Sequence, residues 1–324
     1  MHLLLRKTIL FSFSVLLLSN FACAQETWEE RSAKRFKPLS QQDERFITKA
    51  QPTEASAQPL KERRILVFYR SEGFIHTSIP WGNFALQKMA EKSRAFAVVL
   101  SDDYSVFNAD NLKQYDAILF NNSAELKFPK ESQRQAIMDF INGGKGVVGI
   151  HGATDNFYNW ETGVSMMGGQ FCGHPWTAGG TWAFKLDDPS HPVNGVFRER
   201  GFWHKDEIYQ YCPNTYQGEE NLRILVSLDM TKEKVSELLT SPKHEKHNKK
   251  FGPGPREVPV SWIRSHGNGR LFSTNFGHSE ATYTKPVMMK HLLDGIQYAL
   301  GDLEADDTPS AKIDKPNPAL APNL

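Results

Sequence analysis

Short apolar runs alternate with amphipathic segments between residues 64 and 150. The runs at 64–69, 97–100, 115–120 and 147–150 are typical of buried strands. Residues 79–95 and 131–142 have helical patterns, and Gly143 and Gly144 end the second one. Strands that alternate with helices predict an α/β fold with a doubly wound, mostly parallel sheet.

The pattern is less regular after residue 150 but still indicates strands. Residues 181–186 and 223–228 are predicted as strands, and 202–211 as an extended segment. Residues 258–264 and 270–275 predict a hairpin across a Gly-Asn-Gly turn. A last helix is expected over 285–300, with Gly301 as its cap, so we place the α/β domain at 63–301.

Both ends of the chain differ from this domain. Residues 1–24 have a positive start, an apolar stretch and the cleavage motif Ala22-Cys23-Ala24, which predicts a signal peptide and a secreted or periplasmic protein. We expect cleavage after Ala24 rather than a lipid anchor on Cys23. Residues 25–62 are predicted to be a polar, extended N-terminal arm, and 302–324 a Pro-rich, disordered tail.

Charge and composition exclude several partners. The formal net charge is +1, and loss of Arg6 and Lys7 with the signal peptide makes it −1 (+1 − 2), which argues against nucleic acid or anionic membranes. The apolar stretch at 8–18 is too short to span a membrane. The remaining cysteines, Cys172 and Cys212, allow one disulfide but do not show that it forms. The sequence leaves the oligomeric state open, a homo-oligomer included.

His151 stands at the centre of the candidate chemistry. It follows the apolar run at 147–150, and Gly149 and Gly152 flank it. This spacing permits a sharp strand-to-helix turn that exposes one side chain above a sheet, as in the nucleophile elbow of hydrolases. Histidine at such a turn suits proton transfer or metal binding. A buried histidine with a satisfied hydrogen bond is the structural alternative.

Further polar residues are expected at the same edge of the sheet, because ligands bind beyond the carboxyl ends of the strands in doubly wound folds. His76 and His278 follow predicted strands, and His174 lies in a Gly-rich loop. Asp206 and Glu207 form an acidic pair in an aromatic setting, and one of them could bind a metal or act as an acid/base. Sugar-binding surfaces are expected from aromatic and amide side chains, namely Trp81, Trp176, Asn121 and Tyr209. Each of these residues also has a purely structural interpretation.

The chain resembles the ThuA-like (trehalose utilisation) family in five motifs that occur in serial order. They are Val-Val-Gly-Ile-His-Gly-Ala-Thr-Asp, Gly-Gly-Gln-Phe-Cys-Gly-His-Pro, Ser-His-Pro-Val, Asp-Glu-Ile-Tyr, and Gly-Asn-Gly-Arg-Leu-Phe followed by Phe-Gly-His. The resemblance implies a class I glutamine amidotransferase-like fold with a flavodoxin-like sheet. It implies that His151 stands where amidotransferases have their nucleophilic Cys, and that His278-Ser-Glu280 replaces their His-Pro-Glu. Thiol acyl transfer is then excluded at this turn.

The resemblance implies an enzyme of carbohydrate metabolism that acts on an oxidised (keto-) glycoside or disaccharide, and the predicted signal peptide makes it an exported one. Cleavage or isomerisation would use a divalent metal, with Zn²⁺ as one candidate. The expected metal ligands are His76, His151 and Glu207, with His174 as a further candidate, and the expected acid/base residues are His278 and Asp206. The alternative is a non-catalytic sugar-binding protein on the same scaffold. An esterase or amidase is disfavoured, because the chain has no Gly-x-Ser-x-Gly and no elbow Cys.

Overall fold

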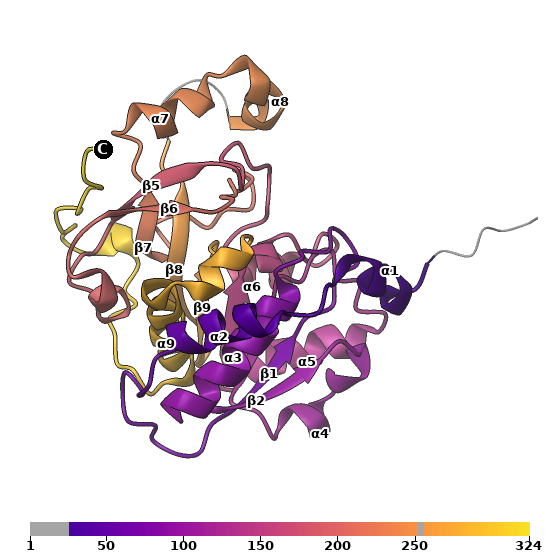
Figure 1. Cartoon of the computed structure of the whole chain (residues 1–324). Coiled ribbons are helices and arrows are strands. Elements are labelled where there is room, and N and C mark those ends of the chain that lie inside the picture. The colour runs from indigo at the N-terminus through magenta and orange to yellow at the C-terminus, as the bar shows by residue number, and fades with distance from the viewer. Residues whose placement is uncertain (1–25, 252–255) are drawn as a thin grey trace, which may run out of the picture.

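The computed structural model describes residues 26–251 and 256–324, and the predicted signal peptide lies outside them. A nine-stranded sheet forms the centre of the molecule, in the order β2-β1-β3-β4-β9-β8-β7-β5-β6 (Figure 1). Its strands are β1 (Arg64–Phe68), β2 (Ala97–Ser101), β3 (Ala117–Asn121), β4 (Gly146–Ile150), β5 (Thr181–Leu186), β6 (Phe202–Lys205), β7 (Arg223–Leu228), β8 (Pro259–His266) and β9 (Gly269–Thr274).

Nine α-helices occur in the described residues. They are α1 (Trp28–Arg35), α2 (Gln41–Ala50), α3 (Ile79–Ser93), α4 (Ala109–Leu112), α5 (Glu131–Asn142), α6 (Glu161–Met167), α7 (Glu233–Ser236), α8 (Glu245–Asn248) and α9 (Pro286–Leu300). Within the described part of the chain, no helix is both long and apolar enough to cross a membrane.

The parallel half of the sheet confirms the predicted α/β class. Strands β2, β1, β3, β4 and β9 pair in parallel. Neighbouring residues of one strand point to opposite faces, so Val148 packs with α3 and α9 on one face, whereas Val147 packs with α5 and α6 on the other. A strand covered on both faces must be apolar throughout, which is why these strands are continuous apolar runs in the sequence.

The other half of the sheet is antiparallel. Strands β8 and β9 form the predicted hairpin, and β7, β5 and β6 extend the sheet from β8. Gly267 has a φ of 58° in the turn, where its missing Cβ leaves room for the adjacent Asn142. The fold is therefore a mixed sheet that is parallel in the half that carries His76, His151 and His278.

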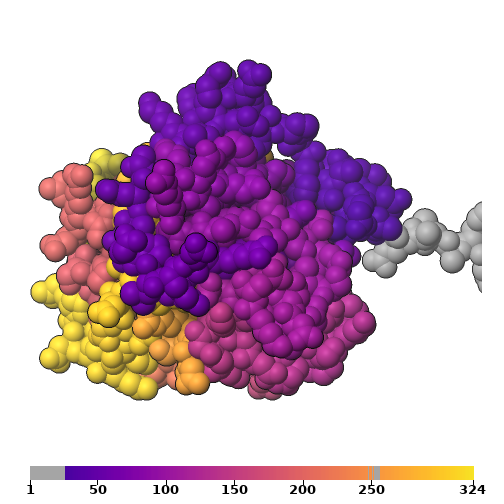
Figure 2. Space-filling model, turned by 90° about the horizontal axis from the view of Figure 1, so that it is seen from below, coloured from indigo at the N-terminus to yellow at the C-terminus, as the bar shows by residue number. Residues whose placement is uncertain are grey.

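The N-terminal arm is not extended, contrary to the prediction. It forms α1 and α2, and each begins with a capping box, Thr27 with Glu30 and Ser40 with Asp43. Figure 2 shows these indigo segments lying against the molecule. Trp28 is only 2% exposed. The prediction failed because each helix buries few side chains, so the polar composition outweighed the capping signals.

The C-terminal tail is docked, which corrects the prediction of disorder. Leu186 and Ala319 exchange two backbone hydrogen bonds of 3.0 Å, and Ser310 accepts one from the Ile224 amide at 2.9 Å. Ala321 is 3% exposed, and its amide donates to Asp229. Apart from a short 3₁₀ turn at Ser310–Lys312, the tail binds as an irregular segment, and such a segment leaves no periodic pattern in the sequence.

Removal of residues 303–324 should therefore destabilise the protein. At least four hydrogen bonds of about 0.5–1.5 kcal/mol each would be lost, and buried surface would be exposed. We expect the melting temperature to fall by more than about 5 °C in a thermal unfolding scan. Asp302 stays in this variant because it forms an ion pair with Arg63. An unchanged melting temperature would mean that the tail does not contribute to stability.

Candidate functional site

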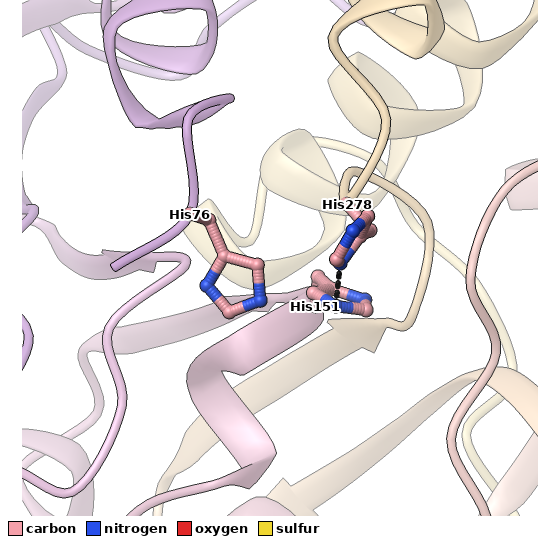
Figure 3. A group of neighbouring side chains, drawn as sticks. All are labelled: His76, His151 and His278. Atoms are coloured by element: carbon pink, nitrogen blue, oxygen red, sulfur yellow. Dashed lines mark hydrogen bonds between the residues drawn. The ribbon is translucent and has the colours of Figure 1, made fainter. Parts of the chain in front are cut away.

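Three histidines converge at the carboxyl edge of the parallel strands (Figure 3). His76 comes from the loop between β1 and α3, His151 follows β4 directly, and His278 follows β9. One ring nitrogen from each lies within 4.8 Å of the others. The order of the strands explains this convergence, because β4 and β9 are neighbours and β1 lies only two strands from β4.

His151 sits at a strained turn, as the sequence predicts. Its φ is 44°, a value that L-residues seldom adopt and that costs of the order of 1–3 kcal/mol. A Cβ on Gly152 would lie 3.1 Å from both His76 and the Asn122 backbone, so glycine permits the close approach of these segments. The fold thus holds His151 in a costly conformation that places its ring under His278.

The contacts of His151 define its tautomer. Its Nδ1 lies 2.8 Å from the backbone oxygen of Asn275, which can only accept, so Nδ1 carries the proton. The Nε2 lone pair is then left to face His278, whose Nδ1 is 3.2 Å away. A histidine that donates one nitrogen to a carbonyl and presents the other is the usual arrangement for a metal ligand or an oriented acid/base.

Glu207 lies among three imidazoles. Its carboxylate oxygens are 3.3 Å from Nδ1 of His278, 3.8 Å from Nε2 of His151 and 3.2 Å from Nδ1 of His174. It follows β6, so the antiparallel half of the sheet supplies this carboxylate. The structure therefore brings together five of the predicted residues: His76, His151, His278, Glu207 and His174.

Burial and charge set the protonation of the cluster. Burial lowers the pKa of His151 to about 4, and burial followed by repulsion from the other imidazoles lowers the pKa of His76. Burial raises the pKa of Glu207, but hydrogen bonds with His174 and His278 and attraction to His151 and His278 together hold it well below its usual value. The hydrogen bond to Glu207 raises the pKa of His174. At neutral pH, His76 and His151 are therefore neutral and lie beside the ionised carboxylate of Glu207.

Asp206 lies beside the cluster, but its carboxylate is hydrogen-bonded to the loop that follows β9. Its oxygens accept from the amides of Gly277 and Ser279 at 2.8 and 2.7 Å, and from the Thr282 hydroxyl at 2.9 Å. It is fully buried. These contacts hold the segment that carries His278, so the geometry favours a positioning role over the predicted acid/base role.

The four predicted sugar-binding residues lie in different places. Tyr209 lies in the site, with its ring 4.2 Å from that of His151 and its hydroxyl 3.4 Å from Nε2 of His76. Asn121 is buried, where its amide donates to Ile79 and Asn83. Trp81 is half-buried against the core. Trp176 is completely buried with its indole bonded to Val235, which contradicts the prediction that it contacts substrate.

Sequence reasoning missed two groups that shape the site. Asn275 anchors two residues of the site. Its backbone oxygen accepts from His151, and its side-chain oxygen accepts from the Tyr209 amide at 2.7 Å. Phe74 lies against His76 with half of its surface exposed. Their positions in the sequence could have identified them as site residues. Asn275 ends a predicted strand, and Phe74 lies two residues before His76.

Cys172 and Cys212 form a disulfide, with Cα atoms 4.9 Å apart. The pairing joins the loop before His174 to the segment after Tyr209. Backbone bonds from Cys172 to Gln210 and from Cys212 to Gln170 reinforce this junction, at 2.8 and 2.9 Å. The disulfide therefore fixes the loop of His174 beside the segment that leads from Glu207 to Tyr211.

The donor set fits a divalent metal ion. Three ligand nitrogens of a tetrahedral zinc lie about 3.3 Å apart, so the observed spread would need only small side-chain rotations. Each of the three imidazoles offers one nitrogen to the same space, as a shared metal ion would require. The same arrangement can transfer protons without a metal, because a neutral imidazole and a carboxylate are both bases.

Acid should destabilise the chelator-treated protein through His151. In the unfolded chain this residue binds a proton near pH 6.5, but in the folded protein only near pH 4. Lowering the pH from 7 to 5 thus favours the unfolded chain, and stability is lost as the pH falls. Wild type should lose about 1–2 kcal/mol more than His151→Gln over this range, measured by urea unfolding. Equal losses would contradict a neutral, buried His151.

Comparisons with known proteins agree with this fold. The model of the family ThuA, described as trehalose utilisation, matches residues 64–299. A solved ThuA-like protein from Bacteroides uniformis ATCC 8492 is 21% identical with a TM-score of 0.54, over 75% of this chain and 94% of that one. Another, from Parabacteroides merdae ATCC 43184, is 21% identical with a TM-score of 0.53, over 74% and 90%. No functionally curated protein matches. The chain belongs to the ThuA family of trehalose utilisation.

Proposed function

We propose that the protein is an exported enzyme that cleaves or isomerises an oxidised (keto-) glycoside or disaccharide with the help of a divalent metal. The description of its family indicates a carbohydrate-related role. The observation that carries the proposal is the convergence of three imidazoles and the Glu207 carboxylate at the end of the parallel strands. Buried groups of this kind with perturbed pKa values favour a chemical rather than a structural role.

His76, His151 and His278 would hold the metal ion. Imidazole nitrogens suit Zn²⁺ and other divalent ions of similar preference. Such an ion would polarise the ketone and stabilise the negative charge that develops on its oxygen. The bond from His151 to Asn275 orients the imidazole for this purpose, and burial keeps it neutral. In this assignment His278 joins the metal ligands, instead of the acid/base role that the sequence suggested.

Glu207 and His174 would move the protons. Glu207 is ionised and takes the hydrogen on the carbon next to the ketone, and the electrons of that C–H bond form a carbon–carbon double bond. The glycosidic bond on the following carbon then breaks, and its oxygen takes a proton from His174. The side chain of His174 is 38% exposed, so it can reach a leaving group at the mouth of the site.

Metal content tests this assignment. Wild type should bind about one divalent ion per chain, and His151→Ala should lose most of it, because a divalent site with two imidazoles is far weaker. His266→Ala is the matched control, since His266 lies at the turn between β8 and β9, at the opposite end of β9 from the cluster. Elemental analysis measures the metal, and incubation with oxidised trehalose measures activity.

Three results would count against the proposal. A His151→Ala variant that keeps its metal would show that His151 is structural. Equal losses in His266→Ala would show that the effect is not local to the cluster. Wild type that binds the oxidised sugar and leaves it intact would favour the non-catalytic sugar-binding protein.

Export is part of the proposal. The Cys172–Cys212 disulfide supports it, because such bonds persist in oxidising compartments. We expect N-terminal sequencing of protein from the native host to begin at Gln25. Cytoplasmic protein that retains Met1 would contradict export.

A further inference from the structure

Helix α1 packs beside the loop that carries His76, although it lies outside the residues that the family model matches. Trp28 is buried against Ile75 and Ile79, and its indole donates to Asp102 at 2.9 Å. Ile75 directly precedes His76, so the helix touches the loop next to the histidine cluster. This contact makes the N-terminal region part of the wall of the site.

Two arginines of α1 hold the backbone of this loop. Arg31 donates to the carbonyl oxygens of Ser71 and Glu72 at 2.8 and 3.0 Å, and Arg35 donates through Nε to that of Ile75 at 3.0 Å. Loop carbonyls that would otherwise face water are thus bonded to a helix. Hydrogen bonds from a charged donor are stronger than neutral ones, so the loop is held in one conformation.

In the loop, Phe74 lies between the residues held by Arg31 and Ile75, which Arg35 holds, and it is 52% exposed. Its ring contacts that of His76 edge to face, with centroids 4.9 Å apart, and lies 15° from parallel to His278 at 6.4 Å. The Arg35 guanidinium is 5.1 Å from the same ring. An exposed aromatic ring adjoining a polar cluster therefore has a cation over one of its faces.

Arg35 is itself exposed. Among the described residues, its guanidinium donates one hydrogen bond, from Nε to the Ile75 carbonyl oxygen. Its four remaining N–H groups are thus available to a ligand. Aromatic rings bind the apolar faces of sugars, and guanidinium groups donate to the hydroxyls at the edges of those faces. Phe74 and Arg35 present both features on one side of the histidine cluster.

We propose that Phe74 and Arg35 form a saccharide subsite at the mouth of the histidine cluster. The subsite takes the second ring of a disaccharide or glycoside, while the oxidised ring lies against the imidazoles. Phe74 stacks on that second ring and Arg35 donates to its hydroxyls. This inference rests on the proposed function, and it adds that a two-ring sugar binds better than its oxidised single ring.

Matched variants test the subsite. Phe46 on α2 is 51% exposed, nearly as exposed as Phe74, and has no ring contact with the cluster among the described residues, so Phe46→Ala is the control for Phe74→Ala. Arg45→Ala, an exposed arginine on α2, is the control for Arg35→Ala. Calorimetry measures binding of oxidised trehalose and of the corresponding ketoglucose to the full-length protein, and a melting scan checks each fold.

Phe74→Ala should weaken binding of the oxidised disaccharide about tenfold and that of ketoglucose less than about twofold. Arg35→Ala should weaken the disaccharide several-fold, Phe74→Tyr should restore wild-type affinity, and both controls should bind as wild type does. Equal losses for the two sugars, or no loss in Phe74→Ala, would overturn the subsite and leave the proposed function standing. Wild type that binds neither sugar would overturn both.

Discussion

The site depends on neutral imidazoles buried beside one ionised carboxylate. Removing a charge from water is costly, so the buried histidines stay neutral and keep their lone pairs. Glu207 stays ionised because hydrogen bonds and nearby imidazoles compensate for its burial. The sheet supplies the rigid support: β4 and β9 fix His151 and His278, and the Asn275 carbonyl selects the tautomer of His151. Loss of this burial would remove the lone pairs that make the cluster able to bind a metal or a proton.

The two halves of the sheet contribute different parts of this chemistry. The parallel half supplies the three histidines, whereas Glu207 and His174 come from β6 and from the loop before β5. The antiparallel extension therefore adds a carboxylate and a fourth imidazole to the three histidines of the parallel half. Asp206 connects the halves, because it lies on the antiparallel side and holds the loop of His278 through backbone amides.

Much of the fold could be predicted from the sequence because buried parallel strands are continuous apolar runs, and those runs place residues such as His151 at strand ends. The convergence of His76, His151 and His278 follows from the same rule. Trp176 could not be assigned, since an indole suits a core and a sugar site equally well and only packing decides between them. The tail and α1 were missed because they are held by backbone bonds and by single side chains such as Trp28, which leave no period in the sequence.

The Cys172–Cys212 bond affects the cellular compartment in which the site can be fully assembled. It joins the loop that leads to His174 with the segment that continues from Glu207, so the contact between these two side chains is held most firmly once both thiols are oxidised. Where the thiols stay reduced, the covalent link is absent and only noncovalent contacts, such as backbone hydrogen bonds, join the loop of His174 to this segment. For an exported chain, assembly of the site would then end at its destination, and a precursor inside the cell would be folded but incompletely competent.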